Sequence, residues 1–150
     1  MEHPLLTAHF KLTELTRSSI ALRHGIGNDP GPEEVVNLTR LAQHILEPVR
    51  QNFALAFSPS SGFRSHQVNK LAGSNGNSQH VTGHAVDFEI PTIPNRILAH
   101  WIKDNLVFDQ LILEFHQEED SSSGWIHCSY NQNKNRKACL IFNGTEYRVF

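Results

Sequence analysis

Two histidines and an aspartate lie close together in the segment 78–88, whose sequence is SQHVTGHAVDF. His80 and His84 are four residues apart, a spacing that on a helix would place both imidazoles on one face, as in the zinc-binding HExxH motif. That motif requires a glutamate directly after the first histidine, and here this position holds Val81. Gly83 would also interrupt a helix, and the residues after it alternate as in a β-strand. The segment is therefore not predicted to be an HExxH helix, and we expect His84 to face solvent or to support a ligand rather than bind metal.

A different geometry brings a loop histidine and a strand carboxylate together. Side chains alternate between the two faces of a strand, so Asp87 lies opposite an apolar set that should face the helices. This apolar set consists of Val86, Phe88 and Ile90. Asp87 should then line a cleft beside His80, which comes from the preceding loop. A later strand offers a third ligand, because His127 lies on the opposite face from its neighbours Ile126 and Cys128.

Two histidines and one aspartate suit zinc. Three protein ligands leave one coordination position open for water, as expected of a catalytic rather than a structural zinc site. A neighbouring carboxylate can accept the proton of that water. Glu114 is the candidate, because the alternation of the preceding strand directs it to one face with Ile112. The residues therefore predict one Zn²⁺ held by His80, Asp87 and His127, with Glu114 as general base.

These side chains need elements to position them, and the first half of the chain favours helices. After a Gly- and Pro-rich loop at 25–32, apolar residues recur at three- and four-residue steps and predict one apolar helix face. That face consists of Val35, Leu38, Ala42, Ile45 and Val49. Pro48 should kink or end this helix. Further helices are expected at 66–71 and 93–106, the latter with Ile97 among its inward residues.

Strands are expected at 53–57, 85–90, 108–115 and 125–130, which are rich in apolar residues and bounded by turn-forming sequence. The segment 138–150 should form a hairpin around its Asn-Gly pair, the strongest short turn signal. Helices followed by mostly antiparallel strands place the chain in the α+β class. We expect residues 1–150 to form a single domain, in which N-terminal helices pack on the sheet.

Composition excludes several other classes of protein. The 150 residues are 39% hydrophobic and 19% charged, as in a globular protein rather than a disordered one. A net charge of -2 gives no support for a nucleic-acid binder. No apolar run is long enough to span a bilayer, and no signal peptide is expected at the start. Cys128 and Cys139 are too few for a disulfide framework, and Cys128 should be a small buried hydrophobe.

Around the predicted metal ligands, the sequence resembles the superfamily of zinc D-Ala-D-Ala carboxypeptidases and dipeptidases. The lysostaphin-type endopeptidases and the hedgehog signalling domain belong to the same group. Its signature S-x-H-x-x-G-x-A-x-D is matched in full by Ser78, His80, Gly83, Ala85 and Asp87. The segment 125–129 (WIHCS) is similar to the final ligand strand, and 61–65 (SGFRS) resembles the segment that precedes the first ligand. The resemblance covers most of the chain, and the segments 10–15 (FKLTEL) and 47–50 (EPVR) also look like the compact branch found in bacteria and their phages.

The resemblance implies a zinc metallopeptidase of hedgehog or D-Ala-D-Ala peptidase-like fold. Its metal ligands would be His80, Asp87 and His127, and Arg64 would hold substrate or stabilise the developing oxyanion. The implied substrate is a peptidoglycan stem peptide, cut by a carboxypeptidase or by an endopeptidase of the endolysin type. The alternative is a non-catalytic cell-wall-binding or virion-associated domain that retains a structural zinc, because fold does not guarantee activity. We expect a monomer that is made in the cytoplasm. Its destination stays open between release to the cell wall, carriage by a phage and recycling of wall fragments in the cytoplasm.

The catalytic base is where this sequence departs from many relatives. In those proteins the acid lies three residues before the last ligand histidine, and here that position is Gly124. The hedgehog branch instead places its glutamate at the end of the preceding strand, which corresponds to Glu114. Because the loop after that strand is longer here, Glu118 and Glu119 remain alternatives to Glu114.

Overall fold

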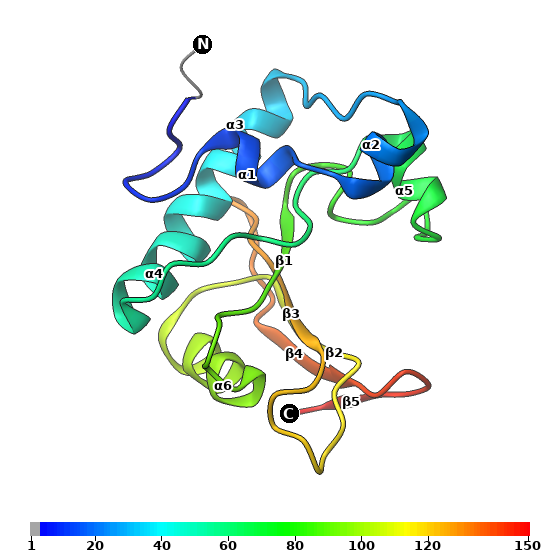
Figure 1. Cartoon of the computed structure of the whole chain (residues 1–150). Coiled ribbons are helices and arrows are strands. Elements are labelled where there is room, and N and C mark those ends of the chain that lie inside the picture. The colour runs from blue at the N-terminus through cyan, green and yellow to red at the C-terminus, as the bar shows by residue number, and fades with distance from the viewer. Residues whose placement is uncertain (1–3) are drawn as a thin grey trace.

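Helices pack against a five-stranded sheet in the computed structural model, which describes residues 4–150 (Figure 1). The helices are α1 (Leu12–Thr16), α2 (Ser19–His24), α3 (Pro32–Leu41), α4 (Glu47–Phe53), α5 (His66–Leu71) and α6 (Asn95–Asn105). A π-helical turn (Ala42–Leu46) joins α3 to α4. The strands are β1 (Ala85–Phe88), β2 (Gln110–Glu114), β3 (Trp125–Ser129), β4 (Ala138–Phe142) and β5 (Tyr147–Val149). The predicted α+β class is confirmed.

The sheet is mostly antiparallel, as predicted, with the strand order β1-β3-β2-β4-β5. Strand β3 lies between β1 and β2 and is antiparallel to both, so that His127 is directly opposite Asp87 on one side and Ile112 on the other. Strands β2 and β4 form the one parallel pair among the described strands, and β5 closes the sheet as the antiparallel partner of β4. The two strand residues predicted to bind metal are thus neighbours across a ladder.

Alternation along the strands separates the core from the face that carries Asp87. The strand residues in the hydrophobic core include Val86, Phe88, Leu111, Leu113, Ile126 and Cys128. They pack against the π-helical turn and helices α3, α4 and α6, which supply Leu41, Ile45, Val49, Leu98 and Ile102. Burying each large apolar side chain contributes roughly 2 kcal/mol. If the strand pairing shifted by one residue, these apolar side chains would lie on the other face of the sheet. Burial of the core therefore fixes the register that places Asp87 and His127 on the face opposite the core.

Of the kink or end predicted at Pro48, the end is wrong, and so is the strand predicted at 53–57. Pro48 does not end the helix, because the wider π-helical turn precedes it and the proline then occupies the first turn of α4, where its missing amide hydrogen costs little. Residues 53–57 do not form a strand: Phe53 ends α4, Ala54 adopts a left-handed conformation (φ 55), and no strand within residues 4–150 pairs with the segment. Phe57 instead packs its ring on Phe10 and Phe88, so tertiary contacts hold this segment without a ladder.

The other predicted elements are present with small shifts of their ends. The helix expected at 93–106 is α6, but Ile97 is 56% exposed because the face toward the sheet carries Leu98 and Ile102. The expected C-terminal hairpin is confirmed as β4 and β5, and the Asn143 carboxamide oxygen accepts hydrogen bonds from the amides of Thr145 and Glu146 in its turn. Within residues 4–150, no helix is both long and apolar enough to cross a membrane.

Candidate metal centre

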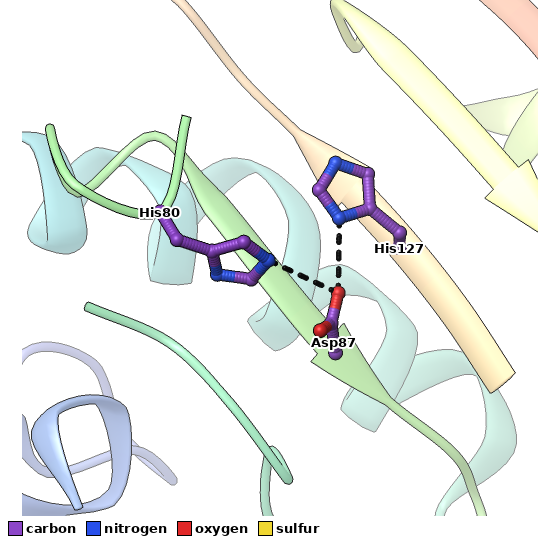
Figure 2. Close-up of side chains that lie close together, drawn as sticks. All are labelled: His80, Asp87 and His127. Carbon is purple, nitrogen blue, oxygen red and sulfur yellow. Dashed lines mark hydrogen bonds and ion pairs between the residues drawn. The ribbon is translucent and has the colours of Figure 1, made fainter. Parts of the chain in front are cut away.

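The side chains of His80, Asp87 and His127 converge on one point (Figure 2). Asp87 Oδ1 lies 2.9 Å from His127 Nδ1 and 3.3 Å from His80 Nε2. Zinc bonds of about 2 Å in a tetrahedral arrangement separate neighbouring ligand atoms by about 3.3 Å, so these three atoms suit a zinc ion. No fourth Cys, His, Asp or Glu joins the cluster among the described residues, which leaves a position for solvent or substrate.

A backbone carbonyl orients the first ligand. His80 is 3% exposed, and its Nδ1 lies 2.8 Å from the carbonyl oxygen of Gly62. With a metal bound, a proton on Nδ1 donated to this oxygen would leave Nε2 unprotonated and free to bind the ion, as is usual for metal-binding histidines. Gly62 is required here, because a Cβ on it would lie 2.3 Å from the backbone oxygen of Leu15. This close approach explains the glycine of the SGFRS segment.

Asp87 is held in place through both its backbone and its carboxylate. Its amide donates to the Ser61 carbonyl at 2.7 Å, and its own carbonyl accepts from the Ser60 amide at 2.9 Å. Burial would raise the pKa of this carboxyl, but hydrogen bonds from His127 and His80 outweigh it and keep the pKa well below the usual 3.8. Asp87 is therefore ionised at neutral pH, which is the form that binds a metal.

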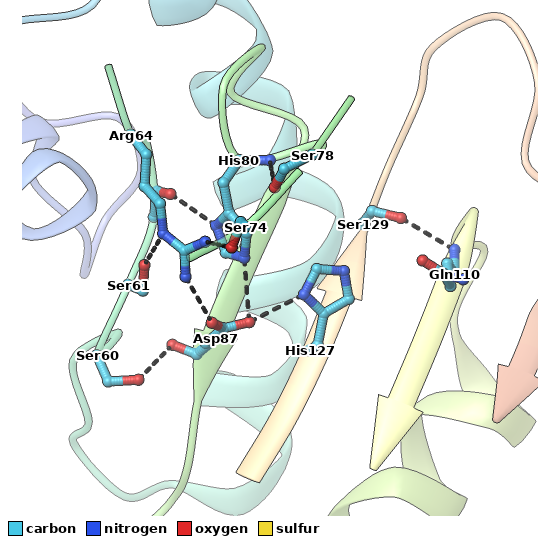
Figure 3. A network of polar contacts seen from close by, with 11 residues as sticks. Ser60, Ser61, Arg64, Ser74, Ser78, His80, Asp87, Gln110, His127 and Ser129 are labelled. Carbon is cyan, nitrogen blue, oxygen red and sulfur yellow. Dashed lines mark hydrogen bonds and ion pairs between the residues drawn. The ribbon is translucent and has the colours of Figure 1, made fainter. Parts of the chain in front are cut away.

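Arg64 lies beside the cluster and is fixed by several partners (Figure 3). Its Nε donates to Ser61 Oγ and its Nη1 donates to Ser74 Oγ, both at 3.1 Å. Its Nη2 lies 3.5 Å from Asp87 Oδ2, a weaker contact. The two serines were not singled out from the sequence, although Ser61 belongs to the SGFRS segment that resembles the family pattern. Ser74 lies in a polar loop without a recognisable signal.

A cavity of about 410 Å³ opens beside the cluster. Its walls include the three clustered side chains together with Arg64, Glu114 and Trp125. Glu114 ends β2 and pairs with Trp125, on the strand face that also carries His127. Its carboxylate makes no hydrogen bond or ion pair within the described part of the chain. Burial raises the pKa of Glu114; the neighbouring His127 opposes this shift and Asp87 adds to it. Glu114 therefore faces the cluster with its oxygens unengaged.

The alternative positions for a carboxylate lie elsewhere. Gly124 has a φ of +72°, and a Cβ on it would lie 1.8 Å from the backbone oxygen of Glu114, so this backbone admits no side chain at the position used by many relatives. The Glu118 carboxylate forms ion pairs with Arg96 and Arg148. Glu118 and Glu119 line a separate cavity under the hairpin of β4 and β5. Of the three glutamates considered, Glu114 is the one that lines the cavity of the cluster.

His84 and Cys128 lie where the strand pattern predicted. His84 is outside the cluster, and its Nδ1 lies 2.7 Å from Thr82 Oγ1. Cys128 is fully buried on the opposite face of β3, among the core residues. Trp125, which the sequence left between core and cleft, lines the cavity with its ring stacked on Phe115 at 5.0 Å. Phe115 was not singled out from the sequence. Its backbone is left-handed (φ 51), so the alternation of side chains along β2 does not predict where its ring lies.

A His-Asp-His cluster at an open cavity is the arrangement expected of a catalytic zinc site. The family model described as Peptidase M15 matches residues 8–129, which include every residue of the cluster. The chain therefore belongs to the Peptidase M15 family and is a zinc metallopeptidase, in agreement with the resemblance seen in the sequence. No curated protein matches the chain in a sequence search.

Proposed function

We propose that this protein hydrolyses an amide bond in peptidoglycan stem peptides, as a D-Ala-D-Ala carboxypeptidase or as an endopeptidase of the endolysin type. The observation that carries the proposal is the convergence of His80, Asp87 and His127 beside a cavity that Glu114 and Arg64 also line. The Peptidase M15 match supports a peptide substrate of the peptidoglycan type.

Each residue has a distinct task in this reaction. A zinc ion would be held by His80, Asp87 and His127 and would supply a Lewis acid at the scissile carbonyl. Glu114 would accept a proton from the attacking water and return it to the leaving amine. Its unengaged oxygens and its raised pKa suit both transfers, because a base whose pKa is nearer neutrality also serves as the acid. Arg64 donates hydrogen bonds to the negative charge that develops on the substrate oxygen.

Mass spectrometry of purified muropeptides, incubated with the protein with and without a chelator, tests the proposal. We expect the wild type to cut one type of bond and the chelator to abolish the cut. Glu114→Gln should retain zinc and lose about 10²- to 10⁴-fold in turnover, the usual contribution of a general base. Glu118→Gln is the matched control and should remain close to wild type, since Glu118 is paired with arginines outside the cavity.

The same experiment distinguishes the non-catalytic alternative. Wild-type protein that contains zinc, binds peptidoglycan and yields no cleaved product would show a wall-binding domain with a structural metal. If Glu114→Gln kept its turnover and Glu118→Gln or Glu119→Gln lost it, the general base would instead be the glutamate in the loop.

A further inference from the structure

A second cavity, of about 450 Å³, adjoins the metal centre and follows β2 toward the loop before β4. It shares Ser74, Ser78, Glu114 and His127 with the cavity of the cluster, so the two form one continuous groove. Most of its remaining wall is uncharged and polar, with several amide side chains that can hydrogen-bond a peptide backbone. Arg136 is the one permanently charged cation among the described residues that line it.

Arg136 is held rigidly by a buried carboxylate. Its Nε and Nη2 donate to Asp109 Oδ1 and Oδ2 at 2.9 Å and 3.0 Å, and its backbone amide donates to Oδ1 at 3.1 Å. The Gln79 side chain donates to Asp109 Oδ2 at 2.8 Å and steadies the same carboxylate. Asp109 is 5% exposed, whereas the Arg136 side chain is 53% exposed.

This pairing leaves part of the guanidinium available. Within the described part of the chain, Nη1 of Arg136 has no hydrogen-bond acceptor. An arginine whose other nitrogens are fixed by a forked ion pair presents its remaining N–H groups in a set direction, so little conformational entropy is lost when they bind an anion. The preferred anion is a carboxylate, because a guanidinium makes short, charge-assisted hydrogen bonds to it.

The strand ladder gives the distance from this group to the reacting bond. Ile112 lies opposite His127, and the strand residue two positions earlier, Gln110, pairs with Ala138, which follows the Arg136 loop. Arg136 precedes Ala138 by two further residues, and β4 lies two strands from β3. Strand residues are spaced by about 3.3 Å and neighbouring strands by about 4.8 Å, so the Arg136 backbone lies up to about 16 Å from that of His127. An extended substrate advances by a similar step per residue.

We propose that Arg136 forms a carboxylate subsite of this groove, through which the enzyme selects peptides with a free carboxylate within about five residues of the scissile bond. The inference rests on the proposed function. The carboxylate is either the C-terminus of the peptide or an acidic side chain, and both present the same chemistry. Arg136 lies beyond residue 129, where the family match ends, so the subsite belongs to the part of the chain outside that match.

Matched synthetic peptides test the subsite once the muropeptide digest has located the bond that is cut. One peptide carries both carboxylates, a second has a C-terminal amide, and a third has its acidic side chain as the carboxamide. For the wild type, kcat/KM should be at least about tenfold lower for one of the two amide peptides than for the peptide with both carboxylates. The affected peptide identifies which carboxylate is bound. In Arg136→Met, this ratio between acid and amide should fall to about one.

A second variant separates recognition from stability, because Arg136→Met leaves Asp109 buried without its partner. The double variant Asp109→Asn/Arg136→Met removes the unpaired charge and should show the same loss of selectivity, with the zinc content and melting temperature of the wild type as checks on folding. Arg136→Lys keeps the charge and loses the fork, so it should retain only part of the ratio. Arg23→Met, an exposed arginine on α2, should leave the ratio unchanged.

The outcomes separate the two proposals. Equal kcat/KM of the wild type on the acid and on both amides would overturn the subsite while the peptidase activity stands. An equal loss on acid and amide peptides in both Met variants would also overturn it, because Arg136 would then only hold the loop. Failure of the wild type to cut any peptidoglycan peptide would overturn the proposed function and the subsite with it.

Discussion

Replacing Gly124 by alanine should damage both the stability and the activity of the protein. Gly124 precedes β3 with a φ of +72°, and an added Cβ would lie 1.8 Å from the Glu114 carbonyl oxygen. The segment that contains Gly124 cannot move away freely, because the buried Asn95 carboxamide donates to the carbonyls of Ser122 and Gly124 at 3.1 Å and 2.8 Å. The end of β2 that carries Glu114 must therefore shift.

The size of the effect has two parts. A left-handed backbone costs a residue with a Cβ about 1 kcal/mol. A carbon atom requires about 3 Å from an oxygen, so the strands must separate by about 1 Å, and the weakened pairing adds roughly 1–3 kcal/mol. We expect Gly124→Ala to lose about 3 kcal/mol in the free energy of unfolding. A displacement of Glu114 by about 1 Å should also lower kcat by about 100-fold.

Denaturant unfolding of the zinc-loaded protein and turnover of muropeptides measure the two effects. Gly25→Ala is the control, because Gly25 also has a positive φ (+62°) but nothing lies within 4 Å of an added Cβ. The control should lose about 1 kcal/mol and keep its activity. If Gly124→Ala matches Gly25→Ala in both measurements, the close approach of Gly124 to Glu114 does not position the base.

Three further predictions concern the metal, the buried acids and the thiols. Chelation of zinc should lower the melting temperature, because a ligand present at a thousand times its Kd stabilises the folded state by about 4 kcal/mol; an unchanged melting temperature would argue against a metal bound by the folded chain. Arg136 holds the pKa of Asp109 at about 2 against the usual 3.8, so the stability from this carboxylate is complete above pH 3.8 and is lost as the pH falls toward 2. The melting temperature of Asp109→Asn should therefore fall less than that of the wild type over this interval, and parallel curves would contradict the ion pair. Burial raises the pKa of the Cys128 thiol, so a thiol reagent should modify Cys128 only after unfolding; rapid reaction of the native protein would contradict its place in the core.

The sequence predicted the metal cluster because short-range rules determine it. Strand alternation alone assigned Asp87 and His127 to the face away from the core, and the antiparallel register then placed them opposite each other. The position of His80 followed from the signature in the loop before β1. The strand inferences needed only local spacing and the assumption that apolar residues face the helices, whereas the choice of His80 over His84 also drew on the resemblance to the family.

Contacts between distant segments were beyond the reach of such rules. The requirement for Gly62 comes from Leu15, and the orientation of Arg64 depends on Ser74 in a loop without a pattern. The ion pair of Arg136 with Asp109 joins residues that are 27 positions apart. Residues 53–57 look like a strand by composition, but no neighbouring strand is available to pair with them, so packing of single side chains decides their conformation.

The most direct test of the zinc centre is the metal content of purified protein, measured for the wild type, Asp87→Ala and Asp109→Ala. Both substitutions remove a buried, hydrogen-bonded carboxylate, but only Asp87 belongs to the cluster. We predict about one zinc per chain in the wild type and in Asp109→Ala, and almost none in Asp87→Ala. Wild-type zinc content in Asp87→Ala would contradict the proposed centre.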